Sequence, residues 1–407
     1  MNRSQWTVRS LALVLVIPVL LSSNLFFATA ISAQEADEQP PIGLWEACPT
    51  PQNLPETITI GAPLGLTGPI SVYGVPQQQG ADIAVEEINA SGYLGESQIV
   101  MAYEDTEGNA EQTIAAMTRL IEDIGVQAIF GPSLSTEAFA ADPIAQEAGI
   151  PVMGVTTSAI GIPEMGDFVF RGNLPEHVLI PFMLDEVIPA LEIEDVAILY
   201  GDDDDFTISG YDVFIEALED RDVTILGEAT FARGDIDFSP QLTTLLAEEP
   251  DALLVSALAS EGVQIILQAR QLGYEGPILG GNGFSTPDVI EQTGEAGNGL
   301  IVGASWNVGQ QDPTESSLRF VEKFEEAYEY APDQFSVQAY TAMWLFATAI
   351  RCTDSVAGED IRDGLLAIED METPLGEFSF DPIGEPIHQP VVQVVEDGLF
   401  ALFNPEE

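Results

Sequence analysis

Short apolar runs alternate with amphipathic stretches along most of the chain, and the alternation is clearest between residues 126 and 158. An apolar run at 126–130 ends at a Gly-Pro pair. Residues 136–146 then carry apolar side chains at helical spacing until Gly149, and a second apolar run follows at 151–155. This pattern predicts a strand, a polar loop, a helix, a second strand and a second polar loop.

The same alternation continues on both sides of this stretch. Before it, the pattern predicts strands at 57–63 and 98–103 and helices at 76–90 and 110–121. After it, a second series predicts helices at 176–190, 208–218, 240–247 and 261–272, with strands at 196–200, 224–231, 252–256, 277–279 and 300–304. Three helices at 313–330, 336–351 and 359–368 and a hairpin of 391–395 with 399–403 complete the chain. Strands that alternate with helices indicate an α/β protein with two parallel sheets covered by helices.

Small hydroxyl side chains follow two neighbouring strands of the first series. Ser133, Ser135 and Thr136 open the helix after the first of them, and Thr156, Thr157 and Ser158 follow the second. Because the carboxyl ends of parallel strands meet at one edge of a sheet, we expect the two groups to lie close together. The first backbone N–H groups of a helix have no partner within it, so this edge suits a small anion, especially a carboxylate. The alternative is that Ser135 only caps the helix and that the threonines are only turn residues.

The N-terminus has the pattern of a secretory signal peptide, with two arginines, an apolar run at 11–27 and small residues after it. We assign residues 1–33 to the signal, and we expect an exported protein in the periplasm or outside the cell. The alternative is a retained membrane anchor, but the apolar run is short and interrupted by Pro18. Residues 34–56 are polar and proline-rich, which indicates an extended lead-in to the first strand.

The chain is strongly acidic, with 67 aspartates and glutamates against 11 lysines and arginines and a formal net charge of −56 in 407 residues. This charge excludes nucleic acid as a partner, because phosphates would be repelled. The acidic residues are scattered over expected helix faces and loops. They indicate either a solvated surface suited to high salt or acidity that serves solubility.

Cys48 and Cys352 are the only cysteines. An even pair in an exported chain indicates one disulfide, which would tie the lead-in to the helix that ends near Arg351. The alternative is two unrelated buried thiols.

Reactive groups are scarce in this sequence. The two histidines, His177 and His388, have no metal-ligand spacing, and no phosphate-binding loop or dinucleotide fingerprint is present. The acidic run at 202–205 could bind a cation, but it lacks the pattern of a calcium loop, so we interpret it as a solvated loop. We therefore expect no catalytic residue, no metal and no cofactor.

Six segments, in this order, resemble the leucine/isoleucine/valine-binding family of periplasmic substrate-binding proteins, the extracytoplasmic receptors of ABC importers. They are ITIGAPLGLTGPISVYG, GADIAVEEINASG, YEDTEGNAEQTIAAMTRLI, GPSLSTEAFA with GIPVMGVTTSA, DFSPQLTTLLAEEPDALLV and ILQARQLG. The resemblance covers nearly all of the chain after the signal. It implies two Rossmann-like lobes joined by three hinge crossings, the type I periplasmic binding protein fold. The first lobe would comprise 57–174 with 305–378, and the second 175–304 with 379–407.

The resemblance also implies a ligand site between the lobes. Ser135 and the backbone after it, with Thr156 and Ser158, would hold a carboxylate and an amino group, and Tyr73 and Phe335 would line the cleft. Phe335 could instead be a plain core residue. Three positions depart from the family pattern: Phe206 stands where a tyrosine is usual, a second usual tyrosine is missing near Leu258, and Asn282 stands where an acidic residue is usual.

The family function would be transport. The resemblance implies a monomer that closes over a small carboxylate ligand, most simply a branched-chain or other apolar amino acid, and delivers it to the permease and ATPase subunits of an ABC importer. Asn282 cannot supply a charge for a ligand ammonium, so Asp205, Glu261 or backbone carbonyl groups would have to replace it. If nothing replaces it, the ligand is an aliphatic or aromatic organic acid. A ligand-sensing protein of the same fold is the remaining alternative.

Overall fold

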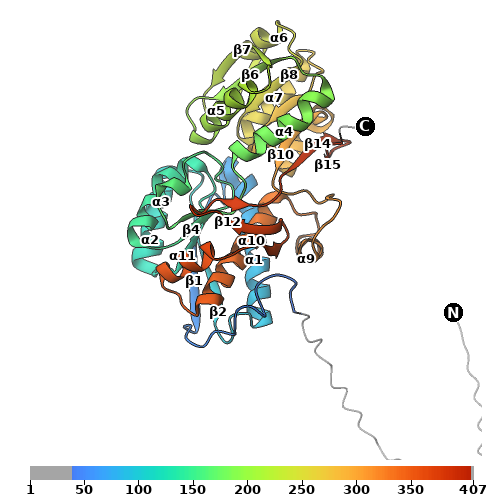
Figure 1. Cartoon of the computed structure of the whole chain (residues 1–407). Helices are drawn as coiled ribbons and strands as arrows, with labels where there is room; N and C mark the ends of the chain where they lie inside the picture. The colour runs from blue at the N-terminus through green and yellow to red at the C-terminus, as the bar shows by residue number, and fades with distance from the viewer. Residues whose placement is uncertain (1–38, 405–407) are drawn as a thin grey trace, which may run out of the picture. The chain divides into compact units, whose positions relative to one another are not determined.

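The computed structural model describes residues 39–404, so the predicted signal at 1–33 and the first part of the lead-in lie outside the described residues. Two separate sheets organise these residues (Figure 1). The first has five parallel strands in the order β2-β1-β3-β4-β5. Its strands are β1 (Thr57–Leu64), β2 (Gln98–Asp105), β3 (Ala128–Phe130), β4 (Val152–Gly154) and β5 (Val169–Arg171).

Helices from both ends of the chain cover this first sheet. They are α1 (Ser71–Ser91), α2 (Ala110–Arg119), α3 (Ser135–Ala148), α10 (Gln334–Thr353) and α11 (Gly358–Leu366), with α9 (Glu315–Tyr328) packed beside α1. Helix α10 is apolar around almost its whole circumference and is buried along nearly its whole length. Its Trp344 and Tyr340 share one core with Phe130 of β3 and with α1. This sheet and these helices are called lobe 1 below.

The second sheet has seven strands in the order β15-β14-β10-β9-β8-β6-β7. Its strands are β6 (Asp195–Gly201), β7 (Thr224–Phe231), β8 (Ala252–Ser256), β9 (Ile278–Gly280), β10 (Leu300–Ala304), β14 (Val391–Glu396) and β15 (Leu399–Leu402). The β6 to β10 pairs are parallel, and the β14–β15 hairpin joins β10 in the antiparallel sense. The helices α4 (Glu176–Leu191), α5 (Asp205–Glu219), α6 (Ser239–Leu246), α7 (Ala259–Gln271) and α8 (Pro287–Thr293) pack around it. This sheet and these helices are called lobe 2.

The chain crosses between the lobes after β5, after β10 and before β14, which confirms the predicted fold with two lobes and three crossings. A small sheet precedes the third crossing, formed by β11 (Met371–Thr373), β12 (Gly376–Phe380) and β13 (Pro386–Ile387). Phe380 of β12 packs edge-on against Phe170 of β5, at 5.4 Å between ring centroids. Within residues 39–404, no helix combines the length and apolarity needed to cross a bilayer.

Two predicted element starts are wrong. Helix α1 begins at Ser71 instead of 76, because a short 3-10 turn at Gly68–Ile70 leads directly into it, so Tyr73 lies in its first turn. Helix α5 begins at Asp205 instead of 208, because the Asp204 carboxylate caps it by accepting from the N–H groups of Phe206 and Thr207.

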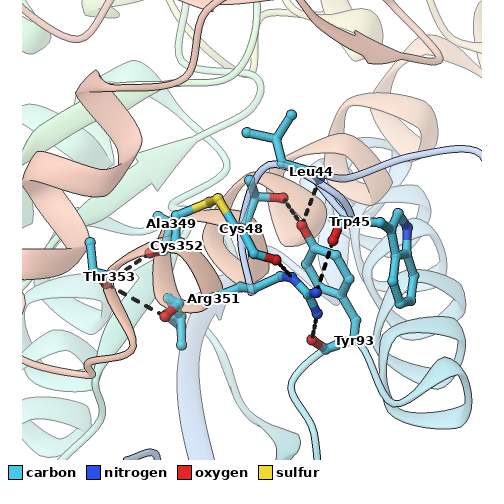
Figure 2. Close-up of a disulfide and its surroundings, with 10 residues drawn as sticks. Leu44, Trp45, Cys48, Tyr93, Ala349, Arg351, Cys352 and Thr353 are labelled. Carbon is cyan, nitrogen blue, oxygen red and sulfur yellow. Dashed lines mark hydrogen bonds between the residues drawn. A yellow bond between two sulfur atoms is a disulfide. The ribbon is translucent and has the colours of Figure 1, made fainter. Parts of the chain in front are cut away.

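The predicted disulfide between Cys48 and Cys352 is present and joins positions 304 residues apart (Figure 2). Beside it, the Arg351 side chain donates to the carbonyl oxygens of Cys48 (2.9 Å), Trp45 (3.2 Å) and Tyr93. Its guanidinium also lies 4.7 Å from the centre of the Tyr93 ring. The lead-in is therefore fixed to the end of α10 by the disulfide and by the hydrogen bonds and ring contacts of Arg351.

Candidate ligand-binding site

The two hydroxyl loops of lobe 1 lie side by side, as predicted from the strand order. The Thr156 hydroxyl donates to the carbonyl oxygen of Ser133, and the N–H of Ala159 donates to Ser135 Oγ at 3.2 Å. Ser135 is the first residue of α3, and the N-cap position is Leu134, whose side chain makes no capping hydrogen bond. Ser135 is therefore not the helix cap that the alternative interpretation supposed.

Gln77 of α1 holds these loops in place, a role that sequence reasoning missed. It is fully buried, and its amide nitrogen donates to Thr156 Oγ1 at 2.7 Å. Its amide oxygen accepts from Ser133 Oγ at 2.7 Å, and Ser133 Oγ accepts from the N–H of Gly65 at 3.1 Å. The only signal in the sequence is a glutamine on the apolar face of an amphipathic helix, and that pattern does not reveal its partners.

A cavity of about 20 Å³, enough for about one water molecule, lies where these loops meet lobe 2. It brings together six of the nine predicted site residues: Tyr73, Ser135, Thr156, Phe206, Asn282 and Phe335. Ser133, Leu134, Leu258 and Gly283 complete its lining. Because the cavity is too small for any amino acid, the two lobes must separate before a ligand can enter.

The other three predicted residues do not line this cavity. Thr136 lies between the lobes, where its hydroxyl accepts from the N–H of Asp205 at 3.1 Å and lies 3.3 Å from Asp204 Oδ2. Thr157 and Ser158 are fully buried; the Ser158 hydroxyl lies beside Glu176, and the Thr157 hydroxyl has no hydrogen-bond partner within residues 39–404. The backbone carbonyl of Ser158 accepts from the N–H of Glu176 at 3.1 Å.

Tyr73 connects the two lobes across the cavity. Its hydroxyl donates to the carbonyl oxygen of Gly283 and accepts from the N–H of Ala259, both at 2.8 Å. Its ring packs edge-on against Phe335, with 5.2 Å between centroids. Burial raises the pKa of Tyr73 far above its ordinary value, so the hydroxyl keeps its proton.

Asn282 has no charge with which to balance a ligand ammonium. Its amide oxygen accepts from Gln334 Nε2 at 2.7 Å, which uses one of its two acceptor positions. The substitutes considered from sequence are no better placed. Asp205 is exposed to solvent, and the two carboxylate oxygens of Glu261 accept from the N–H of Gly234 (2.8 Å) and from Ser260 Oγ (2.6 Å).

Glu176, the first residue of α4, lies directly behind Asn282 and was not predicted. It is fully buried, and its Oε1 accepts from the N–H of Asn282 at 2.8 Å. Burial raises its pKa to about 7, although the hydrogen bonds from Asn282 and from the Ser158 hydroxyl and the charge of Arg171 act in the opposite direction. Because a glutamate in the first turn of a helix is common, nothing in the sequence distinguishes this one.

Arg171, at the end of β5, is buried next to Glu176. Its Nη2 donates to the carbonyl oxygen of Ala159 at 2.8 Å, and its Nε lies 3.1 Å from Glu385 Oε2. Burial also raises the pKa of Glu385 to about 7, while Arg171 opposes this rise. Arg171 therefore pairs with the partly buried Glu385 before the third crossing, and its charge also acts on Glu176 at the first crossing.

The acidic run at 202–205 is not uniformly solvated, contrary to the prediction. Asp204 is buried as the cap of α5, and Arg233 Nη1 lies 3.9 Å from its Oδ2. The same arginine donates from Nη2 to the carbonyl oxygen of Gly108 in lobe 1 at 3.4 Å. In the part of the chain that the structure describes, no group of three or more histidine, cysteine, aspartate or glutamate side chains could hold a metal ion.

A second and larger cavity, of about 770 Å³, is lined by the start of α1, by α8, by the second crossing after β10 and by the β14–β15 hairpin. Apolar side chains such as Trp306, Tyr330 and Phe400 line it together with Asp288 and Asp333. It contains none of the small hydroxyl groups that follow β3 and β4, so the smaller cavity is the better candidate for a carboxylate ligand.

Two α/β lobes with a cavity between them, at the carboxyl ends of parallel strands, define a type I periplasmic binding protein. The family model for periplasmic binding proteins matches residues 57–398. The chain belongs to this family, and within it to the leucine/isoleucine/valine-binding proteins, which bind solutes and are not enzymes.

Relatives and solved structures agree with this assignment. The leucine-, isoleucine-, valine-, threonine- and alanine-binding protein of Pseudomonas aeruginosa is 23% identical over 334 residues, which are 81% of this chain and 87% of that protein. The substrate-binding protein LivJ of Streptococcus pneumoniae, solved with isoleucine, is 26% identical with a TM-score of 0.79, over 84% of this chain and 97% of that one. A solute-binding protein of R. palustris, solved with benzoate, is 22% identical with a TM-score of 0.78, over 85% and 95%.

Proposed function

We propose that this protein is the exported ligand receptor of an ABC importer and that it closes over an aliphatic α-amino acid. The lobes would be 57–174 with 305–378 and 175–304 with 379–407, and the receptor would act as a monomer that docks on the permease and ATPase subunits. The observation that carries the proposal is the cavity in which Ser135 at the start of α3 and Thr156 after β4 face apolar side chains of both lobes.

The hydroxyl groups of Thr156 and Ser135 would bind different polar groups of the ligand. The proton of Thr156 is already donated to the Ser133 carbonyl, so towards a ligand Thr156 can only accept, which suits an ammonium group. Ser135 Oγ accepts from the N–H of Ala159 and keeps its own proton to donate, which suits a carboxylate. The first turn of α3 adds backbone N–H groups beside Ser135.

The remaining lining sets the kind of side chain that fits. Tyr73, Leu134, Phe206, Leu258 and Phe335 contribute an apolar surface without a charged group. Such a lining favours an aliphatic or aromatic body over a polar one. The ligands of the similar proteins, leucine, isoleucine, valine, threonine and alanine for one and isoleucine for the other, are mostly aliphatic amino acids and agree with this chemistry.

Entry of the ligand would require the two hydrogen bonds of Tyr73 to break, because they join the lobes directly across a cavity of about 20 Å³. Free protein would then exchange between open and closed forms, and contacts from both lobes would make the ligand favour the closed one.

An aromatic or aliphatic carboxylic acid is the second candidate. The amide at Asn282 and the benzoate bound by the R. palustris protein favour it. Isothermal titration calorimetry with leucine, isoleucine, phenylalanine, 4-methylpentanoate, 3-phenylpropanoate and benzoate separates the two candidates. Tighter binding of the amino acids supports the proposal, equal or tighter binding of the acids supports the second candidate, and binding of neither class refutes both.

A further inference from the structure

An amino acid enclosed between the lobes brings a positive charge with it, and a buried charge requires a counter-charge or several acceptors. Among the candidates, the amide of Asn282 is uncharged, Asp205 is exposed and both oxygens of Glu261 are occupied. Thr156 can accept only one further hydrogen bond and carries no charge. The cavity lining thus contains no group that balances an ammonium.

Glu176 lies immediately behind that lining and connects its two sides. Its N–H donates to the carbonyl oxygen of Ser158 in lobe 1, and its Oε1 accepts from the N–H of Asn282 in lobe 2. Its side chain accepts only from neutral donors, the N–H of Asn282 and the Ser158 hydroxyl. Within the described residues this buried carboxylate therefore has no ion-pair partner, and a cation that enters the cavity would supply one.

The charges around Glu176 lead to the same conclusion. Arg171 is the buried cation of this region, and its Nε already lies 3.1 Å from the carboxylate of Glu385. The neighbouring His177 is neutral near pH 7, since burial lowers its pKa. Glu164 is exposed to solvent. Since Arg171 pairs with Glu385, no ion pair to Glu176 is found within residues 39–404, and a ligand ammonium would stabilise the charged form of its carboxyl group.

We propose that Glu176 provides the counter-charge for the ligand ammonium and thereby makes the site select an amino acid over the corresponding deaminated acid. This inference rests on the proposed function, because it applies to the same cavity. Glu176 supplies the negative charge that an acidic residue at the position of Asn282 would supply in other family members. The ammonium need not touch Glu176. It would be held by Thr156 in a cavity shielded from water, where the attraction to a buried carboxylate behind Asn282 is strong.

The test compares two neighbouring glutamates. Glu176→Gln removes the proposed counter-charge, and Glu385→Gln is the matched control, because it removes the partly buried carboxylate that pairs with the nearby Arg171. Calorimetry is carried out on wild type and both variants with leucine against 4-methylpentanoate and with phenylalanine against 3-phenylpropanoate. We expect Glu176→Gln to weaken binding of the amino acid by at least about tenfold and to leave binding of the acid unchanged or tighter. Glu385→Gln should leave the ratio of the two affinities within about threefold of wild type.

A second readout does not depend on any variant. Titration of the wild type at pH 6.5 in buffers of different ionisation enthalpy counts the protons exchanged on binding. We expect release of protons with the amino acid and none with its deaminated partner, because an ammonium nearby favours the charged form of Glu176.

The outcomes are separable. An unchanged ratio of affinities in Glu176→Gln, or an equal change in Glu385→Gln, overturns the assignment of Glu176 while the proposed function stands. Identical proton exchange for the amino acid and the acid also overturns it. Binding of the acids alone by wild type refutes the proposed function itself, and the assignment of Glu176 with it. If Glu176→Gln does not fold, Glu176→Asp takes its place and should keep the preference for the amino acid.

Discussion

Two buried arginines in lobe 1 have opposite surroundings. Arg351 is 4% exposed, donates to three backbone carbonyl groups and stacks on aromatic rings, and within residues 39–404 no salt bridge to a carboxylate is found for it. Arg171 is fully buried, donates to one carbonyl oxygen, lies 3.1 Å from Glu385 Oε2 and lowers the pKa of Glu176 by its charge. Its Nη1 has no hydrogen-bond partner. An arginine whose nitrogens all have hydrogen-bond partners indicates a purely structural region. Buried polar atoms without partners indicate a place where a ligand or a lobe movement supplies them.

Disruption of the region around Arg351 and the disulfide should cause the largest loss of stability. Removal of the disulfide by Cys48→Ser with Cys352→Ser should lower the free energy of unfolding by at most about 5 kcal/mol, because the bond closes a loop of about 300 residues. Urea unfolding followed by circular dichroism measures the loss. Ligand affinity should remain that of the wild type, and a weaker affinity would show that the two regions are coupled.

Arg171 and Arg351 can each be replaced by methionine, an apolar residue of similar length. Arg171→Met leaves the carboxylates of Glu176 and Glu385 without a nearby cation and should cost about 3–5 kcal/mol of stability at pH 8. The loss should shrink towards pH 5, where both carboxyl groups are protonated. Arg351→Met also destabilises the protein, but its loss should not depend on pH, since its partners are carbonyl groups. Denaturation curves at the two pH values decide this, and equal pH dependence in both variants would contradict the comparison.

The wild type should itself be more stable in acid than at neutral pH in the absence of ligand. Burial raises the pKa of Glu176 and of Glu385 to about 7 in the folded state, above the ordinary value of 4.5. A raised pKa stabilises the folded state fully below pH 4.5, and this contribution is lost as the pH rises through 7. The loss is at most about 3 kcal/mol for each group. Melting temperatures between pH 5 and pH 8 should therefore fall, and Glu176→Gln should reduce the fall.

The same contrast explains which features could be predicted from the sequence. The strands β8 and β10 have the predicted boundaries, because each is a short, largely apolar run between turn residues, and β7 also has them although it contains Glu228. The disulfide followed from an even cysteine count in a chain predicted to be exported. Local pattern and composition contain enough information for such features.

Gln77, Arg171 and Glu176 could not be predicted in the same way. Their partners lie far away in sequence, with 79 residues between Gln77 and Thr156 and 106 between Glu176 and Asn282. A buried polar residue is defined by contacts that only the folded chain brings together. The start of α1 was wrong for a more local reason: Pro76 is an ordinary residue for the first turn of a helix, yet the preceding 3-10 turn starts the helix at Ser71.

The smallest predicted effect concerns the hydroxyl groups of the cavity itself. Ser135→Ala removes the free hydroxyl donor at the start of α3 and should weaken ligand binding by about 1–3 kcal/mol, because a hydrogen bond to a charged carboxylate is lost. Thr157→Ala is the matched control, since its hydroxyl is equally buried but lies outside the lining. Calorimetry on the best ligand of the wild type measures both. Both variants should keep the melting temperature of the unliganded protein within a few degrees, because neither hydroxyl caps a helix. Loss of binding in Thr157→Ala with normal binding in Ser135→Ala would move the carboxylate from the first hydroxyl loop to the second.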